Sequence, residues 1–160
     1  MIDHPVSKPA DHAGVRVPPP LIYIVLFGLG TAMHQIVPIS IPPVMPMYVA
    51  ALIFLGGGVL LAIWSNVLFR RAHTSLVPIK PTTALVMRGP YRLTRNPMYL
   101  GLLCVYIGVA LWFGVVWALI FVPLVVLAVQ WLAIAKEEQY LEQKFGDAYR
   151  QYRAHVRRWL

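Results

Sequence analysis

Two long stretches of this chain contain no charged residue. Residues 17–69 and residues 96–135 hold no Asp, Glu, Lys or Arg. A helix that faces water needs a polar stripe along one side, and stretches of this length leave no room for one. Because a bilayer core is crossed by about 20 apolar helical residues, the pattern predicts membrane-spanning helices rather than helices of a water-soluble domain.

The first stretch contains two candidate spans. Its apolar segments lie at 21–37 and 47–69, and the proline-rich segment 38–46 separates them. Proline has no backbone N–H group and interrupts a helix, so we expect this segment to be a short connection between two antiparallel helices.

The second stretch is too long for one span. We expect residues 98–135 to form a tight helical hairpin that turns near Phe113 and Gly114. Pro123 is expected to kink the returning helix. The chain is therefore predicted to be all-α, a polytopic membrane helical bundle with four transmembrane helices.

Composition and charge agree with this prediction and add an orientation. Hydrophobic residues make up 59% of the chain and charged residues 12%, against about 45–50% and about 25% in soluble domains. The net charge is +8. Residues 70–95 contain basic residues and no acidic ones, whereas the segment 38–46 carries no charge. Basic loops stay on the cytoplasmic side, which predicts cytoplasmic termini in a multi-pass protein of a bacterial-type inner membrane.

Three regions follow from these patterns. Residues 1–20 mix charges with prolines ahead of the first apolar segment, so we expect a flexible cytoplasmic leader rather than a cleaved signal peptide. Residues 21–69 hold the two N-terminal spans. Residues 70–160 hold a cytoplasmic loop, the helical hairpin and a C-terminal cytoplasmic helix, and we expect this half to carry any chemistry of the chain.

Several function classes are excluded or disfavoured. The single cysteine, Cys104, cannot form an intramolecular disulfide, and no metal site is expected, His73 having no partner at a ligand spacing. The basic excess beside apolar spans indicates anionic lipid rather than nucleic acid as a partner. The Gly56–Gly58 run suits close packing of membrane helices. No glycine-rich turn follows a strand, as a Rossmann site would require.

The loop before the hairpin carries the first candidate chemistry. Residues 88–101 are interrupted by Gly and Pro, and Pro97 suits the first position of a helix whose positive end faces this loop. Arg92 and Arg95 would add to the attraction for an anion there, and either could hold the carboxylate of a ligand. The alternative is that these arginines only contact lipid headgroups.

Two adjacent carboxylates form the second candidate. Glu137 and Glu138 lie where the last apolar segment ends, a costly position for negative charge close to lipid. Their position indicates a cationic partner, either an arginine of the chain or a ligand with a sulfonium or ammonium group. Glu138 could also act as a base that takes a proton from an amine or thiol of a ligand. A solvated helix end is the alternative.

Several separated motifs together resemble the isoprenylcysteine carboxyl methyltransferase and phospholipid methyltransferase superfamily. They cover about residues 70–158 in matching order and spacing, and they are Gly89-Pro90-Tyr91, Arg95-Asn96-Pro97-Met98-Tyr99-Leu100-Gly101, Glu137-Glu138 and Phe145-Gly146-Asp147-Ala148-Tyr149-Arg150-Gln151-Tyr152. The resemblance implies a membrane methyltransferase that takes S-adenosyl-L-methionine from the cytoplasm and a lipophilic or lipidated acceptor from the bilayer, as in isoprenylcysteine carboxyl methylation.

The resemblance also implies site residues. The cofactor-binding positions would be Thr83, Ala84, Leu85, Val86, Tyr91, Asn96, Pro97, Met98, Tyr99 and Glu137, with Arg92, Arg95 and Glu138 as the catalytic candidates. Asn96 stands where the family often has histidine. Eukaryotic members carry a substrate-associated arginine one turn before the acidic pair, and here that position falls near Ala133, with Gln130 the nearest polar residue.

Two other functions remain open on the sequence. A membrane reductase of the steroid-reductase type would use the arginines of 88–95 for the phosphates of NADPH, although the paired carboxylates suit a cationic cofactor better. A non-catalytic lipid-binding membrane protein would retain the fold without binding a cofactor. The chemical nature of the acceptor (carboxylate, amine or thiol) is open as well.

Overall fold

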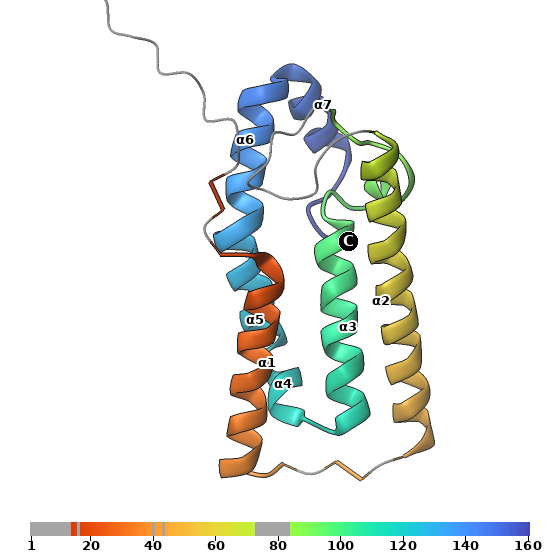
Figure 1. Ribbon diagram of the computed structural model, residues 1–160, viewed down its shortest axis with the longest axis vertical. Helices are drawn as coiled ribbons and strands as arrows, with labels where there is room; N and C mark the ends of the chain where they lie inside the picture. The colour runs from red at the N-terminus through yellow and green to blue at the C-terminus, as the bar shows by residue number, and fades with distance from the viewer. Residues whose placement is uncertain (1–13, 16, 40, 43, 73–83) are drawn as a thin grey trace, which may run out of the picture.

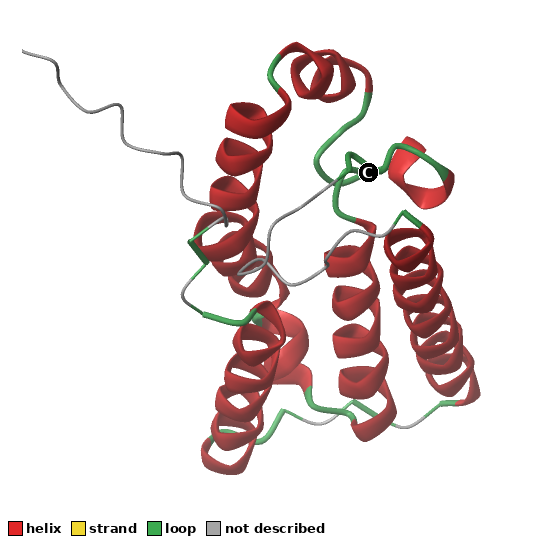
Figure 2. Ribbon diagram, turned by 45° about the horizontal axis from the view of Figure 1, so that its top comes forward, coloured by secondary structure: helices red, strands yellow, loops and turns green. Residues whose placement is uncertain are grey.

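The computed structural model describes residues 14–15, 17–39, 41–42, 44–72 and 84–160 (Figure 1). Within them the chain forms α1 (Pro19–Ile36), α2 (Met45–Arg71), the 3₁₀ turn η1 (Gly89–Arg92), α3 (Pro97–Phe113), α4 (Val116–Ile120), α5 (Val122–Val129), the π-helical turn η2 (Gln130–Ile134), α6 (Ala135–Phe145) and α7 (Asp147–His155). These residues contain helices, loops and one isolated bridge (Figure 2). The all-α prediction is confirmed for this part of the chain.

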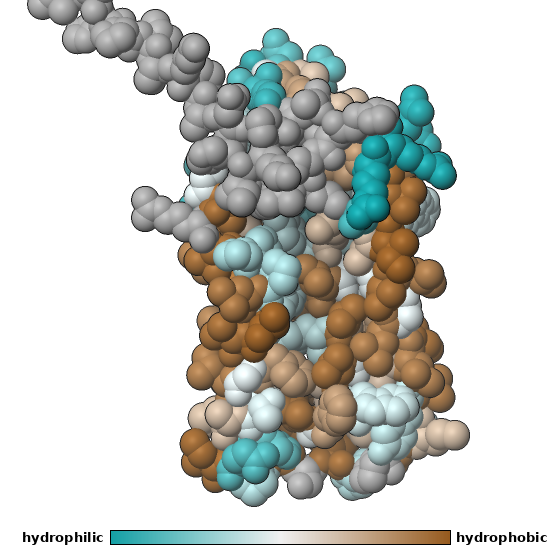
Figure 3. All heavy atoms as spheres, in the orientation of Figure 1, coloured by the Kyte–Doolittle hydropathy of each residue, from teal (hydrophilic) through white to brown (hydrophobic). Residues whose placement is uncertain are grey.

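Among the described residues, two helices are long and apolar enough to cross a membrane, α1 and α2. Only 11% of the most apolar window of α2 is buried, which distinguishes it from the core helix of a soluble protein. Ile53 and Leu60 on α2 are 67% and 69% exposed. Hydrophobic side chains cover the flank of the bundle, and hydrophilic ones gather chiefly at the end where α2 finishes (Figure 3). An apolar flank of this kind belongs in lipid.

The predicted hairpin is present, but its two limbs differ. α3 ends at Gly114, whose φ of 66° is the left-handed conformation that glycine adopts at helix ends. The returning limb is interrupted at Phe121, two residues before Pro123, and divides into α4 and α5. It then continues through η2 into α6. α3 has 17 residues and falls below the length of α1 and α2, so the count of four spans stays a prediction.

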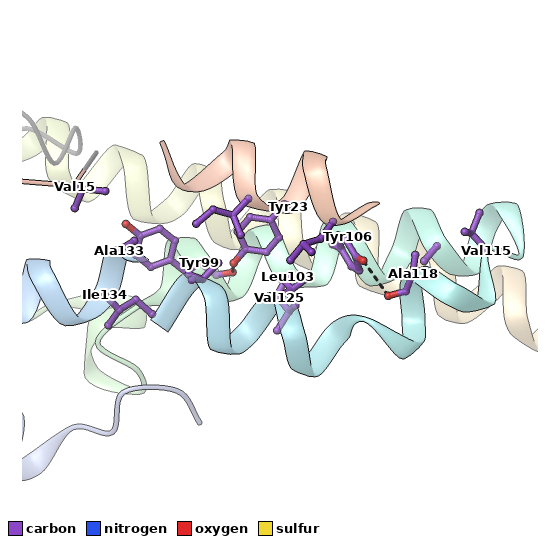
Figure 4. Close-up of a cluster of buried hydrophobic side chains, with 14 residues drawn as sticks. Val15, Tyr23, Tyr99, Leu103, Tyr106, Val115, Ala118, Val125, Ala133 and Ile134 are labelled. Atoms are coloured by element: carbon purple, nitrogen blue, oxygen red, sulfur yellow. Dashed lines mark hydrogen bonds between the residues drawn. The ribbon is translucent and has the colours of Figure 1, made fainter. Parts of the chain in front are cut away.

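Buried tyrosines hold the helices together inside the apolar core (Figure 4). The Tyr23 hydroxyl on α1 donates a hydrogen bond to the Tyr99 carbonyl on α3 at 2.9 Å. Tyr106 on α3 donates to the Ala118 carbonyl on α4 at 3.0 Å. Both hydroxyls are thereby satisfied away from water, where an unpaired one would be costly. Val15, in the region predicted as a leader, is 6% exposed and belongs to the same core.

α2 and α3 lie side by side because glycines let their backbones approach (Figure 1). A Cβ atom added to Gly58 would lie 2.6 Å from the Gly101 carbonyl oxygen, and one added to Gly101 would lie 2.8 Å from the Gly58 carbonyl oxygen. Cβ atoms on Gly56 and Gly57 would meet nothing within 4 Å. Of the predicted packing run, Gly58 alone makes the close contact.

We therefore predict that Gly58→Ala destabilises the protein. The added methyl group forces two helix backbones apart, at a cost of about 1–3 kcal/mol for overpacking. Gly57→Ala is the matched control, because its methyl group enters open space and alanine favours the helix. Thermal unfolding in detergent micelles should show a lower melting temperature for Gly58→Ala only. Equal melting temperatures for the two variants would contradict the packing described.

Candidate active site

Segments far apart in the chain meet at the end of the bundle that carries α6 and α7. They are η1, the loop 93–96, the first turn of α3, α6 and the segment 156–160. The C-terminus lies beside the start of α3 (Figure 1). The loop and the first turn of α3 therefore face α6 with the last residues of the chain between them.

Hydrogen bonds attach the last residues to this loop. The backbone amide of Arg95 donates to the Arg157 carbonyl at 2.9 Å. Thr94 Oγ1 and Asn96 Nδ2 both donate to the Arg158 carbonyl, each at 2.9 Å. Thr94 and Asn96 are 2% and 8% exposed. These three hydrogen bonds hold the loop 93–96 against the last residues of the chain.

Glu138 is neutralised by two arginines. Its Oε1 atom lies 3.2 Å from Nη2 of Arg95, and its Oε2 atom lies 2.5 Å from Nη2 of Arg158. Nε of Arg158 also donates to Oε1 at 3.1 Å. This contact raises the pKa of the Arg158 guanidinium above its usual range. The side chains of Glu138 and Arg95 are 8% and 9% exposed and that of Arg158 is 31% exposed. The buried carboxylate thus joins the loop, α6 and the C-terminal segment in one ion-pair cluster.

Glu137, the preceding residue, is in a different environment. Its Oε1 atom accepts a hydrogen bond from the Tyr99 hydroxyl, and no cation among the described residues pairs with it. Burial raises its pKa from 4.5 to about 7, the Tyr99 hydrogen bond opposes this rise, and the charge of Glu138 adds to it. Glu137 is thus a carboxyl group whose ionised form lacks a positive partner.

Tyr91 lies close to Glu137 and is buried against α2. Its ring packs on that of Phe69 with centroids 5.3 Å apart, and its carbonyl accepts a hydrogen bond from the Tyr152 hydroxyl at 2.7 Å. Burial raises the pKa of Tyr91 well above its usual range, the Ser65 hydroxyl opposes the rise, and the charge of Glu137 contributes to it. Tyr91 stays a neutral phenol at physiological pH.

The structure brings together some of the predicted site residues. Tyr91, Tyr99 and Glu137 converge, and the Arg95 side chain, 9% exposed, lies beside them through Glu138. Pro97 is fully buried at the start of α3. The other residues of the predicted cofactor-binding set that are described here are all partly buried: Ala84, Leu85, Val86 and Met98.

Other predicted residues have different surroundings. Arg92 is exposed on η1. The Asn96 amide binds the Arg158 carbonyl, so it acts in holding the loop. Glu138 is engaged by two guanidinium groups rather than standing free as a base. Thr83 and His73 lie outside the described residues.

The sequence analysis missed the C-terminal contributions. Arg158 pairs with Glu138, and Trp159 Nε1 donates to Oε1 of Gln130 at 3.3 Å. In the sequence Arg158 is one of several basic residues in the last segment, and nothing local distinguishes it from those that follow the positive-inside pattern. The π-helical turn directly before α6 was also missed, although turns of this type are frequent at functional sites.

Comparison with known families agrees with this geometry. A family model described as phospholipid methyltransferase matches residues 46–148, from the start of α2 to the start of α7. The chain belongs to the phospholipid methyltransferase family. The resemblance seen in the sequence motifs is confirmed, and membership implies a membrane methyltransferase activity.

One curated relative is similar over part of the chain. An uncharacterized protein of Haemophilus influenzae is 48% identical over 63 residues, which cover 39% of this chain and 100% of that protein. No solved structure matches the chain.

The contrasting surroundings of the two glutamates predict opposite effects on stability. At pH 8, Glu138→Gln should destabilise the protein by about 3 kcal/mol, because it leaves two arginines without their carboxylate. Glu137→Gln should instead stabilise it, because it removes a negative charge that has no cationic partner. Melting temperatures of both variants in detergent micelles test this prediction.

The pH dependence provides the control. A raised carboxyl pKa in the folded state means that the contribution of Glu137 to stability is lost as the pH rises from 4.5 to about 7. The melting temperature of Glu137→Gln relative to wild type should therefore increase between pH 4.5 and pH 8. A constant difference would show that Glu137 is not perturbed.

Proposed function

We propose that this protein transfers a methyl group from S-adenosyl-L-methionine to a lipophilic acceptor at the Tyr91–Tyr99–Glu137 cluster. The observation that carries the proposal is the partly buried Glu137 carboxyl group, which has a tyrosine donor and no cationic partner among the described residues. A positively charged ligand supplies the missing compensation. Family membership supports the methyltransferase reaction.

The residues at this end of the bundle fit such a cofactor. Glu137 would face a sulfonium or ammonium group, and the neutral rings of Tyr91 and Tyr99 would lie against the ligand, where aromatic faces attract cations. The non-helical residues 84–88 and the start of α3 would complete the site. S-adenosyl-L-methionine, when bound, supplies an electrophilic methyl group.

The residues of the chain contribute mainly by positioning. The Tyr99 hydroxyl holds the Glu137 carboxylate in one orientation, and Tyr23 in turn holds the first turn of α3 through the Tyr99 carbonyl. A preorganised carboxylate of this kind needs no rearrangement when a cation binds. Holding donor and acceptor in line supplies most of the acceleration in a displacement reaction.

The acceptor is proposed to have a hydrocarbon chain. An apolar groove of about 280 Å³ lies between α1 and the returning limb, lined by Val17, Leu21, Ile22, Val25, Leu26, Ala128 and Leu132. Leu132 lies in η2, five residues before Glu137 in the helical stretch that η2 and α6 form together. A lipid chain in this groove would bring its head group to the cluster from the side of the bundle.

The full topology belongs to the same proposal. Four spans, with the cluster and both termini on the cytoplasmic side, place the site where a water-soluble cofactor and a membrane-borne acceptor meet. The acceptor group is proposed to be a carboxylate, as in isoprenylcysteine carboxyl methylation. A carboxylate is already ionised at neutral pH, which agrees with a site whose Glu138 is held in ion pairs.

Transfer of labelled methyl from S-adenosyl-L-methionine into a membrane lipid extract tests the function. The purified protein should label a lipid product, and Glu137→Gln should bind the cofactor about 10- to 100-fold more weakly because a charged contact is lost. Glu142→Gln, a change on the exposed side of α6, is the matched control and should retain binding.

The outcomes separate the alternatives. Labelled lipid identifies the acceptor class by its chemistry, as an ester, an amine or a thioether. Binding of NADPH in place of S-adenosyl-L-methionine would favour a reductase. A folded protein that binds neither compound would overturn the proposal.

A further inference from the structure

Arg95 has a buried edge without a partner. Its side chain is 9% exposed, and Nη2 pairs with Glu138 at 3.2 Å. Its Nε and Nη1 atoms are buried and have no hydrogen-bond partner among the described residues. A charged donor that is buried without a hydrogen-bond partner costs more free energy than a neutral donor in the same position. An edge of this kind indicates that a bound ligand would supply the hydrogen-bond acceptor.

The charges around this edge do not balance. Arg95 and Arg158 carry two positive charges and share one carboxylate, that of Glu138. The hydroxyl of Tyr149, a residue that is 1% exposed, lies close enough to the Arg95 guanidinium for hydrogen bonding to lower its own pKa, but it makes no well-formed hydrogen bond to Nε or Nη1. Tyr152 interacts with the charge of Arg95. Burial raises the pKa of Tyr149 to about 12 and that of Tyr152 above its usual range, so both phenols are neutral and supply no negative charge. Arg158 is 31% exposed, so Arg95 is the buried guanidinium of the pair, and it shares its carboxylate with a second arginine that reaches solvent.

We propose that the Nε–Nη1 edge of Arg95 is a subsite for one oxyanion, a carboxylate or a phosphate, of a ligand bound at the Tyr91–Tyr99–Glu137 cluster. The proposal rests on the function proposed above. Two parallel N–H donors of a guanidinium match the two oxygens of such a group. Glu138 and Arg158 are then positioning residues, because they occupy the other side of the guanidinium and leave this edge open.

The subsite and Glu137 are complementary in charge. Among the described residues, Glu137 has no cationic partner and the Nε–Nη1 edge of Arg95 has no anionic one, while Glu138 is shared between Nη2 of Arg95 and Arg158. One ligand that carries both charges would satisfy both, as would two ligands that each carry one. The oxyanion therefore has two possible sources, the carboxylate of the cofactor and an anionic head group of the acceptor.

Arg95→Lys tests the subsite without removing the charge. Lysine retains a cation for Glu138 but lacks the paired donor edge. Calorimetry should measure binding of S-adenosylhomocysteine and of its decarboxylated analogue, and of dodecanoate and dodecyl phosphate with neutral dodecanol for comparison. Arg153→Lys is the matched control. The Arg153 side chain is 48% exposed, so this variant should change none of these affinities. Melting temperature verifies that each variant is folded.

The two sources give different results. If the cofactor supplies the oxyanion, Arg95→Lys weakens S-adenosylhomocysteine binding about 10- to 100-fold, and the decarboxylated analogue binds both proteins equally. If the acceptor supplies it, Arg95→Lys leaves the affinity for S-adenosylhomocysteine unchanged. The variant then binds dodecanoate or dodecyl phosphate more weakly by a comparable factor, and its affinity for dodecanol is unchanged.

Other results overturn one proposal or the other. If wild type and Arg95→Lys bind all of these compounds with equal affinity, the oxyanion subsite is wrong and the methyltransferase proposal stands. If wild type does not bind S-adenosylhomocysteine but Arg95→Lys still loses affinity for the lipid anions, the subsite stands and the proposed cofactor is wrong. Loss of dodecanol binding together with the anions would show a structural effect and contradict the subsite.

Discussion

The ion-pair cluster of Glu138 with Arg95 and Arg158 is the constraint on which the candidate site depends. It joins three segments that are distant in sequence, the loop before α3, the beginning of α6 and the end of the chain. Because it uses one of two adjacent carboxylates, it leaves Glu137 to face the tyrosines with no cation from the described residues. Which of the two glutamates the arginines reach therefore decides which one is structural and which one is left for the proposed ligand.

Much of the fold could be predicted from the sequence because lipid imposes simple rules on it. The absence of charges over residues 17–69 and 96–135 predicts apolar helices, prolines mark a connection, and Gly114 marks the hairpin turn. The sequence motifs also predict that Tyr99 and Glu137 share one site, although 38 positions separate them. Each of these predictions rests on a local signal or on a motif that matches a family.

The remaining features depend on tertiary contacts that leave no local signal. Arg158 looks like any basic residue near a membrane, and only the folded chain places it on Glu138. Asn96 looks like a ligand-binding amide, yet it contacts the backbone of Arg158. The π-helical turn η2 within the returning limb cannot be predicted from an uninterrupted apolar segment. Only one of three consecutive glycines, Gly58, contacts another helix backbone.

The central claim is that a cation binds the ionised form of Glu137. Proton release on binding S-adenosyl-L-methionine tests it most directly, by calorimetry at pH 7 in two zwitterionic buffers that differ in ionisation enthalpy. A carboxyl group with a pKa of about 7 is about half protonated at that pH. The account predicts release of about half a proton per cofactor by wild type and none by Glu137→Gln. Binding to wild type with no release, or with proton uptake, would contradict it.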